Sequence, residues 1–290
     1  MVQDERLDVR VARDFGLSRR KAQDSIGAGQ IDVGLTRARD AGCRVNEAQA
    51  VTYHPSRRRE ERIRLSLPAA YQDEVLVVVD KPAGLLTVPT DGGTRDDSVL
   101  SRLRQDLTRV LGPRAYVGAL HRLDRGTSGL VAVALSRECH AKGRAAFKHH
   151  AFHRVYLALV EGVPRNASGT IDLKIADEYE SGQRHIADDD EPSRHAVTHY
   201  KVMERFPRHA LLEVELDTGR QHQIRLHLRA IGHSIMGDSV YGTAKKLSGA
   251  RPLLHASRLA FPHPLSGQPI DCASPPPIDF AQTLKRLRSR

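Results

Sequence analysis

The sequence predicts an α+β protein in which a small N-terminal α/β unit precedes a larger domain with a largely antiparallel sheet. Beyond residue 71, strand-like apolar runs are interrupted by only a few helical stretches, which argues against repeated strand–helix–strand units. The first 53 residues carry helix and strand patterns of their own, and a charged stretch follows them. We therefore expect a small domain at 1–53, a linker at 54–70 and a larger domain at 71–290.

The N-terminal segment begins with two predicted helices. Leu7, Val11 and Phe15 are spaced four residues apart, which places them on one face of a helix. Ser18 is a suitable N-cap for a second helix at 19–26, and glycines followed by a short strand end that helix.

Three cationic residues, Arg19, Arg20 and Lys21, occupy the first turn of the second predicted helix. Positive charge at a helix N-terminus opposes the helix dipole and costs about 0.3 kcal/mol or more per residue. Because an anion would remove this cost, we expect these side chains to contact an anionic partner. The alternative is a solvated basic face of the helix.

The larger domain is predicted to contain six strands and three helices. Short apolar runs between turn residues predict the strands, and apolar residues at helical spacing predict the helices. In chain order these are strand 75–79, helix 98–111, strand 130–135, helix 136–149, strands 155–160, 170–175, 197–203 and 211–216, and helix 220–230.

The chain has 290 residues and a formal net charge of +10, which favours an anionic partner, most commonly nucleic acid. Cys43, Cys139 and Cys272 are widely separated, so we expect neither a disulfide framework nor a thiolate metal site, and we expect a cytoplasmic protein. The sequence contains no long uncharged apolar stretch, so it predicts no membrane span and no secretion signal.

The most informative stretch is H-R-L-D-R-G-T-S-G-L at 121–130. It places the Asp124 carboxylate between Arg122 and Arg125, whose positive charges favour the ionised form. An ionised carboxylate on a loop before a strand can act as a nucleophile. An isolated H-R-L-D is more simply a salt-bridged surface turn, but the ten-residue combination is far less common by chance.

This stretch resembles the signature of the RluA-type pseudouridine synthases, and further blocks follow in the order of that family. Ser234 stands where a proline is common in the family, a difference that affects only a turn. The other blocks are D-K-P-A-G-L at 80–85, Y-L-A-L-V-E-G at 156–162, T-G-R-Q-H-Q-I-R-L-H at 218–227, G-H-S-I-M-G-D-S-V-Y-G at 232–242, and the closing segment 254–264.

The resemblance implies a pseudouridine synthase catalytic domain, which detaches uracil from ribose and rejoins the sugar to a ring carbon. Asp124 is then the catalytic residue at the glycosidic bond of a uridine flipped out of RNA. The breaking bond develops positive charge on the sugar, which the carboxylate can stabilise or trap covalently, and the sequence leaves both open. Tyr156 is expected to stack on the base and transfer a proton, and Arg225 to pair with Asp124.

Further residues are expected to contact RNA. Arg122 is expected to fill the place that the flipped uridine vacates. Arg220 and His222, in the first turn of the predicted helix 220–230, are expected to bind phosphate, and Lys81 to contribute similarly. The predicted RNA-contacting set also includes His121 and Thr127 of the signature loop.

The sequence predicts neither a cofactor nor a metal. Isomerisation conserves every atom of the substrate, so it requires no redox cofactor or group donor. The glycines at 27–32 do not complete a dinucleotide-binding motif, and no phosphate-binding P-loop motif occurs. His149, His150 and His153 have metal-like spacing, but no cysteine or carboxylate completes the set.

The first 53 residues resemble the S-four-type RNA-binding domain, through R-L-D at 6–8 and S-R-R-K-A at 18–22, although Gly34 replaces the usual Asn. The expected partner is therefore RNA, more commonly large-subunit ribosomal RNA than transfer RNA, and the protein is expected to be a monomer. Two other functions stay open at this point: a non-catalytic RNA-binding protein, and a hydrolase that releases free uracil.

Overall fold

The computed structural model describes residues 4–34, 36–38, 40–55, 64–90, 96–177, 183–242 and 251–289. The chain forms two compact units, Met1–Arg64 and Leu65–Arg290. Among the described helices, none is both long and apolar enough to cross a membrane.

The described part of the first unit contains two helices and five short strands. The helices bury the predicted apolar stripe, with Leu7 and Val11 fully buried, and the Ser18 hydroxyl accepts a hydrogen bond from the Lys21 backbone N–H at 3.2 Å. Strand β2 pairs antiparallel with β3 and β5, and β1 pairs with β4. The elements are β1 (Glu5–Arg6), α1 (Leu7–Asp14), α2 (Arg19–Gly27), β2 (Ile31–Val33), β3 (Thr36–Arg37), β4 (Arg44–Val45) and β5 (Val51–Tyr53).

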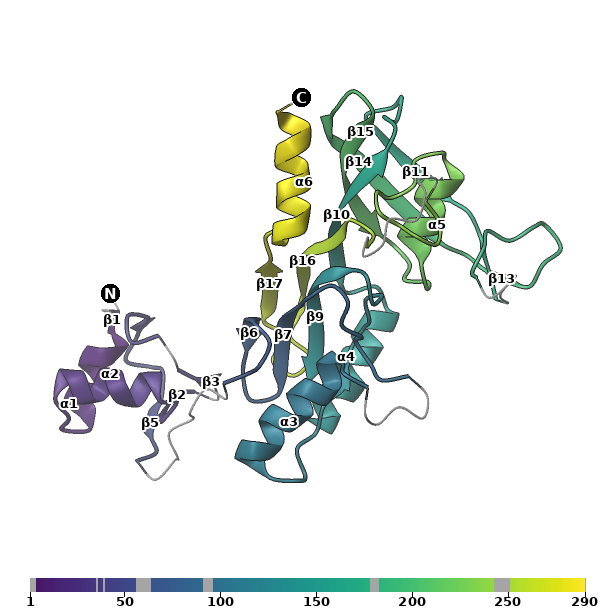
Figure 1. The fold of residues 1–290 in the computed structure, drawn as a ribbon. Helices are drawn as coiled ribbons and strands as arrows, with labels where there is room; N and C mark the ends of the chain where they lie inside the picture. Colours follow the sequence, from purple (N-terminus) through teal and green to yellow (C-terminus); the bar gives the residue numbers. More distant parts are fainter. Residues whose placement is uncertain are drawn as a thin grey trace. The chain divides into compact units, whose positions relative to one another are not determined.

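The second unit is built on a ten-stranded sheet with the order β11-β14-β15-β10-β16-β9-β7-β6, in which β17 pairs with β16 and β8 pairs with β9 (Figure 1). Its pairs are antiparallel except β16 with β9, so the predicted fold class is confirmed. The strands are β6 (Ala69–Gln72), β7 (Leu76–Lys81), β8 (Gly118–Ala119), β9 (Ser128–Ala134), β10 (His153–Glu161), β11 (Ser168–Asp172), β14 (Val197–Arg205), β15 (His209–Leu216), β16 (Leu254–Pro262) and β17 (Pro269–Ala273). A separate short pair consists of β12 (Ile175–Ala176) and β13 (Ser193–Arg194).

Four helices belong to this unit: α3 (Val99–Leu111), α4 (Arg137–Lys148), α5 (Gln223–Ala230) and α6 (Ile278–Arg288). Helix α4 packs on β9 and β8, and α5 packs on β14 (Figure 1). The predicted helix 220–230 begins three residues later than expected, because His222 adopts a left-handed backbone conformation with φ 58°. The sequence did not predict β6, β8, β16, β17 or α6.

Part of the predicted linker belongs to the second unit. The Ser66 backbone N–H and hydroxyl donate hydrogen bonds to the Asp106 carboxylate at 2.7 and 2.8 Å. Leu67 is buried, and β6 begins at Ala69, within the range assigned to the linker. Residues 65–70 are therefore held by burial and sheet pairing, while 56–63 of that range lie outside the described residues.

The parallel contact between β9 and β16 immediately follows the signature loop, residues 121–127. Ser128 pairs with His255 and Gly129 with Ala256. Gly129 has φ +112°, and a Cβ there would lie 2.3 Å from the Ala256 carbonyl oxygen. Only glycine permits this close approach to the Ala256 backbone, so Gly129 fixes the point at which the chain passes from the signature loop into β9.

Candidate active site

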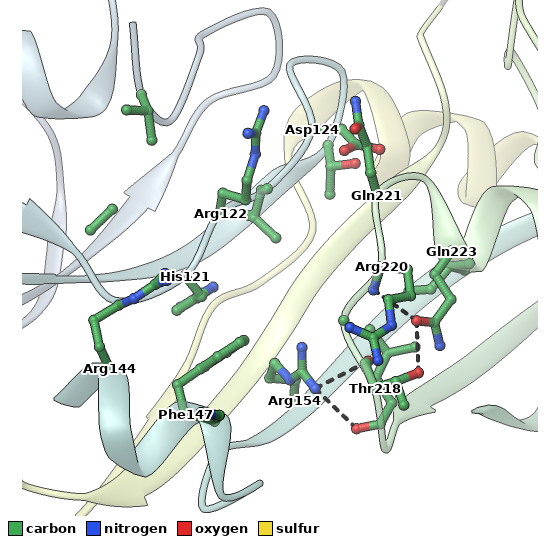
Figure 2. A pocket seen from close by; sticks show the side chains of 18 of the residues that line it. His121, Arg122, Asp124, Arg144, Phe147, Arg154, Thr218, Arg220, Gln221 and Gln223 are labelled. Atoms are coloured by element: carbon green, nitrogen blue, oxygen red, sulfur yellow. Dashed lines mark hydrogen bonds between the residues drawn. The ribbon is translucent and has the colours of Figure 1, made fainter. Parts of the chain in front are cut away.

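A cavity of about 1220 Å³ opens beside the signature loop (Figure 2). Its wall combines segments that are far apart in the sequence: the signature loop, helix α4, strand β10, the loop after β15 and helix α5. The predicted catalytic residues Asp124, Tyr156 and Arg225 all line it, as do Arg122, Arg220 and His222.

The signature loop is held by main-chain and hydroxyl contacts. The Thr127 backbone N–H donates to the Asp124 carbonyl oxygen at 3.1 Å, which closes a turn. The Thr87 hydroxyl donates to the Leu123 carbonyl oxygen at 2.9 Å and accepts from the Leu123 N–H at 3.0 Å. These bonds fix the backbone on both sides of the Asp124 side chain, which is 23% exposed toward the cavity.

Arg225 pairs with Asp124, as the resemblance implied. Its Nη1 lies 3.3 Å from Asp124 Oδ2. The same guanidinium donates from Nε and Nη2 to both oxygens of Asp238, at 2.7 and 2.8 Å. Arg225 is therefore a buried cation between two carboxylates, a geometry that a two-pronged guanidinium provides and an ammonium does not.

Asp238 and Tyr241 are site residues to which the sequence analysis assigned no role. Asp238 Oδ1 also accepts from the backbone N–H groups of Val240 and Tyr241, at 3.0 and 3.1 Å. Burial raises the pKa of Asp238, but its bonds from Arg225 outweigh burial and the pKa lies below its usual value. The Arg225 guanidinium lies 4.8 Å from the centre of the Tyr241 ring. The G-D-x-x-Y-G block was the available signal for both residues.

His222 lies close to Asp124. Its Nε2 lies 3.8 Å from Asp124 Oδ2, and its Nδ1 is 2.8 Å from the Tyr241 hydroxyl. Burial lowers the pKa of His222, which favours a neutral ring. His222 lines the cavity, and its predicted phosphate contact stays a prediction.

Tyr156 lies on β10, between β15 and β16, where it pairs with Val214 and Ala256. Its side chain is buried in the cavity wall, and burial raises the pKa of the phenol. Arg122 is exposed on the signature loop at the opening of the cavity (Figure 2).

The loop before α5 is organised by Gln223, another residue without a predicted role. Its Oε1 accepts from the Thr218 hydroxyl at 2.8 Å and from the Arg220 N–H at 2.9 Å. Its Nε2 donates to the Val197 carbonyl oxygen at 2.9 Å. Arg220 is exposed at the cavity and donates from Nε to the His195 carbonyl oxygen at 3.1 Å.

The predicted phosphate contact of Lys81 is wrong. Its side chain is fully buried, and Nζ donates to the carbonyl oxygens of Pro82, Leu85 and Arg125 at 3.1, 2.8 and 3.3 Å. Burial lowers the pKa of Lys81 to about 8. The ammonium ties the D-K-P-A-G-L turn to the signature loop and does not reach solvent.

His121 and Thr127 line the cavity but are only 6% and 2% exposed, so they offer little surface for the predicted RNA contact. His121 Nε2 accepts from the Ala132 N–H at 3.1 Å, and its ring stacks on Phe147 with centres 5.7 Å apart. Burial lowers the pKa of His121 to about 3 and keeps the ring neutral.

The three predicted cations of the N-terminal unit are exposed on α2. Arg19 is also bonded to the buried Asp8, with Nε 3.1 Å from Oδ2. Within the described residues, the side chains of Arg20 and Lys21 form no hydrogen bond or ion pair, so they remain the better candidates for a phosphate contact.

Comparison with known proteins identifies the family of this chain. A sequence profile of the family described as RNA pseudouridylate synthase matches residues 75–230. The ribosomal large subunit pseudouridine synthase D of Zymomonas mobilis is 36% identical over 234 residues, which cover 77% of this chain and 73% of that protein. An uncharacterized RNA pseudouridine synthase of Mycobacterium bovis is 40% identical over 224 residues, or 75% of this chain and 72% of that protein.

The fold is also found among solved structures. Human RNA Pseudouridylate Synthase Domain Containing 4 superposes with a TM-score of 0.64 at 24% identity, covering 76% of this chain and 92% of that one. The matched profile spans more than half of the chain, and the relatives exceed 30% identity over most of their length. The chain therefore belongs to the RNA pseudouridylate synthase family of isomerases.

Proposed function

We propose that this protein isomerises specific uridines of ribosomal RNA to pseudouridine and that Asp124 acts on the glycosidic bond. The observation that carries the proposal is the carboxylate of the family signature, held 3.3 Å from buried Arg225 in a cavity that Tyr156 also lines. Relatives from Zymomonas mobilis and Pseudomonas aeruginosa are named ribosomal large subunit pseudouridine synthase D, which supports large-subunit RNA as the substrate.

The contacts of Asp124 favour attack on, or stabilisation of, the sugar. Arg225 and His222 both approach the same oxygen of Asp124, Oδ2. Within the described residues, Oδ1 has no hydrogen-bond partner and is available to a ribose. A carboxylate positioned by a buried arginine can offset the positive charge that develops at the sugar carbon.

Tyr156 enters the reaction as a neutral phenol, because burial raises its pKa. A neutral phenol can stack on the detached uracil and offer its oxygen for proton transfer while the base turns. Uracil leaves as a delocalised anion, so a single carboxylate suffices where glycosidases need two.

RNA recognition is proposed to involve both units. Arg122, an exposed residue two positions before Asp124, is the residue proposed to occupy the position of the extruded uridine. In the N-terminal unit, exposed Arg20 and Lys21 supply the charge for an S-four-type contact with RNA phosphates.

The decisive experiment combines a variant with pseudouridine mapping. Asp124→Asn is expected to abolish pseudouridine formation while RNA binding persists, because the amide keeps the shape and loses the charge. Mapping pseudouridines in total RNA with and without the gene identifies the target uridines.

Exposed Asp97→Asn serves as the matched control and is expected to keep full activity. Full activity of Asp124→Asn, or an unchanged pseudouridine map in the deletion strain, would refute the proposal. Release of free uracil by the wild-type protein would instead identify a hydrolase.

A further inference from the structure

Arg154 is a buried cation in the cavity wall that pairs with none of the described carboxylates. It lies on β10, two residues before Tyr156, and is 8% exposed. Its Nη2 donates to the carbonyl oxygens of Leu216 and Thr218, both at 3.2 Å, while its buried Nε has no hydrogen-bond partner. In the parts of the chain that the structure describes, Arg154 forms no ion pair.

This arrangement differs from that of Arg225, the other buried arginine of the cavity. Burying a charge is costly unless a counter-charge or several hydrogen bonds compensate it. Two neutral carbonyl oxygens and the face of Phe147, whose ring centre lies 4.9 Å from the guanidinium carbon, compensate Arg154 only in part. A buried guanidinium with unused donors is suited to an anion that arrives from the cavity.

The surrounding wall is also cationic. Among the described residues that line the cavity, six are Lys or Arg and two are Asp. Both carboxylates are engaged, Asp124 with Arg225 and Asp217 with His199 at 2.9 Å. Figure 2 shows Arg144 to one side of Arg154 and Arg220 to the other, and all three arginines line the cavity.

The loop next to Arg154 is shaped to accommodate its guanidinium. A Cβ at Gly219 would lie 2.7 Å from Arg154 Nη1, so any side chain there would displace the arginine. Residues 154 and 156 point to the same face of β10, about 7 Å apart along the strand. This separation is similar to the distance between neighbouring nucleotides in an RNA strand. An anion bound at Arg154 would therefore lie about one nucleotide away from the base that Tyr156 is proposed to stack on.

We propose that Arg154, together with Arg144 and Arg220, binds a backbone phosphate of the RNA next to the extruded uridine. This inference rests on the proposed function, because it takes the occupant of the cavity to be an RNA strand. The phosphodiester supplies the counter-charge that Arg154 lacks, and its fixed place orients the ribose toward Asp124.

The test pairs a protein variant with a neutralised phosphate. The RNA is a labelled fragment that contains the mapped target uridine, with each phosphodiester near that uridine replaced in turn by an uncharged methylphosphonate. Dissociation constants are measured for full-length protein in an Asp124→Asn background, with and without Arg154→Gln. Arg154→Gln alone, or the methylphosphonate at the contacted position alone, is expected to weaken binding about tenfold. The two changes together are expected to weaken binding no further than either one alone.

Two further variants keep the test independent of folding defects. Arg144→Gln changes an exposed side chain of α4 and is expected to show the same coupling in weaker form. Arg165→Gln, an exposed arginine outside the cavity, is the matched control and is expected to show none. If the losses from Arg154→Gln and every methylphosphonate simply add, Arg154 only positions the loop at 216–218 and the inference is overturned.

A separate measurement distinguishes this inference from the proposed function. Wild-type protein is assayed for pseudouridine formation on the same unmodified RNA. If no pseudouridine forms, the proposed function fails. If pseudouridine forms but no phosphate couples to Arg154, only the phosphate contact is refuted.

Discussion

Arg225 is the residue on which the site geometry depends. Its guanidinium joins Asp124 on the signature loop to Asp238, thirteen residues further along the chain than Arg225 itself. Each of the three charges is buried or half-buried, and each is compensated by another. Removing one partner therefore costs more than the pair contributes, because it leaves the others uncompensated.

We expect Arg225→Lys to lower the turnover number roughly thirtyfold, the equivalent of about 2 kcal/mol, with RNA affinity nearly unchanged. An ammonium keeps the charge but cannot hold both oxygens of Asp238 and Asp124 together. Single-turnover pseudouridine formation and RNA binding measure the two effects. Arg258→Lys alters a similar two-pronged pair with Asp271 at an exposed position and should leave both unchanged. An equally active Arg225→Lys enzyme would contradict this role.

Lys81 predicts a pH dependence of stability. The pKa of its ammonium falls from 10.5 in the free side chain to about 8 in the fold, because of burial. Between pH 8 and 10.5, Lys81 is protonated in the unfolded chain and largely deprotonated in the folded protein. Because the unfolded state binds more protons in this range, the contribution of Lys81 to the free energy of unfolding rises with pH. We expect the free energy of unfolding of wild type, relative to Lys81→Met, to increase from pH 8 to 10.5.

Urea unfolding at several pH values provides the measurement for Lys81. The exposed Lys174→Met variant is the control and should follow wild type across the range. A constant difference between wild type and Lys81→Met from pH 8 to 10.5 would show that Lys81 titrates normally.

At the scale of elements, the contact between β9 and β16 positions the site. This contact pairs Ala256 of β16 with Gly129 of the signature. It immediately follows the loop that carries Asp124. The sequence matched both segments to the family but gave no reason for them to pair in parallel. Period-two patterning indicates a strand, and it does not identify the neighbour of that strand.

Gly129→Ala is expected to destabilise the protein by about 3 kcal/mol or more, because its Cβ would overlap the Ala256 backbone and its φ is +112°. Gly267→Ala is the matched control. That glycine has φ +72° and no atom within 4 Å of a Cβ, so we expect a loss of about 1 kcal/mol. Chemical denaturation of both variants measures the difference, and equal losses would contradict the close approach.

At the scale of the whole molecule, the chain combines two units with separate cores. The first unit buries its own apolar cluster around Leu7 and Ile26, and the second buries one around Val78 and Phe261. Since each core is complete within its unit, the larger unit should not need the smaller one to fold.

We expect deletion of residues 1–64 to leave the thermal unfolding midpoint of the remainder within a few degrees of the intact protein and to weaken RNA binding. The double variant Arg20→Gln/Lys21→Gln loses two phosphate contacts. It should therefore reduce the slope of the logarithm of the binding constant against the logarithm of salt concentration by about 1.5. Thermal denaturation and RNA titrations at several salt concentrations test both statements. Unchanged affinity and salt slope would identify the basic helix as a solvated face.

The sequence by itself predicted the fold class through local patterning, and its motifs, through their resemblance to a family, predicted a shared site for Asp124, Tyr156 and Arg225, which line one cavity in the structure. Only the tertiary structure showed that Lys81 and His121 are buried supports, that Asp238 completes the ion pair, and that Arg154 lacks a counter-charge. The physical reason is that burial and charge pairing arise between segments distant in sequence. A charged residue looks the same in a sequence whether it meets solvent, a carbonyl oxygen or a carboxylate.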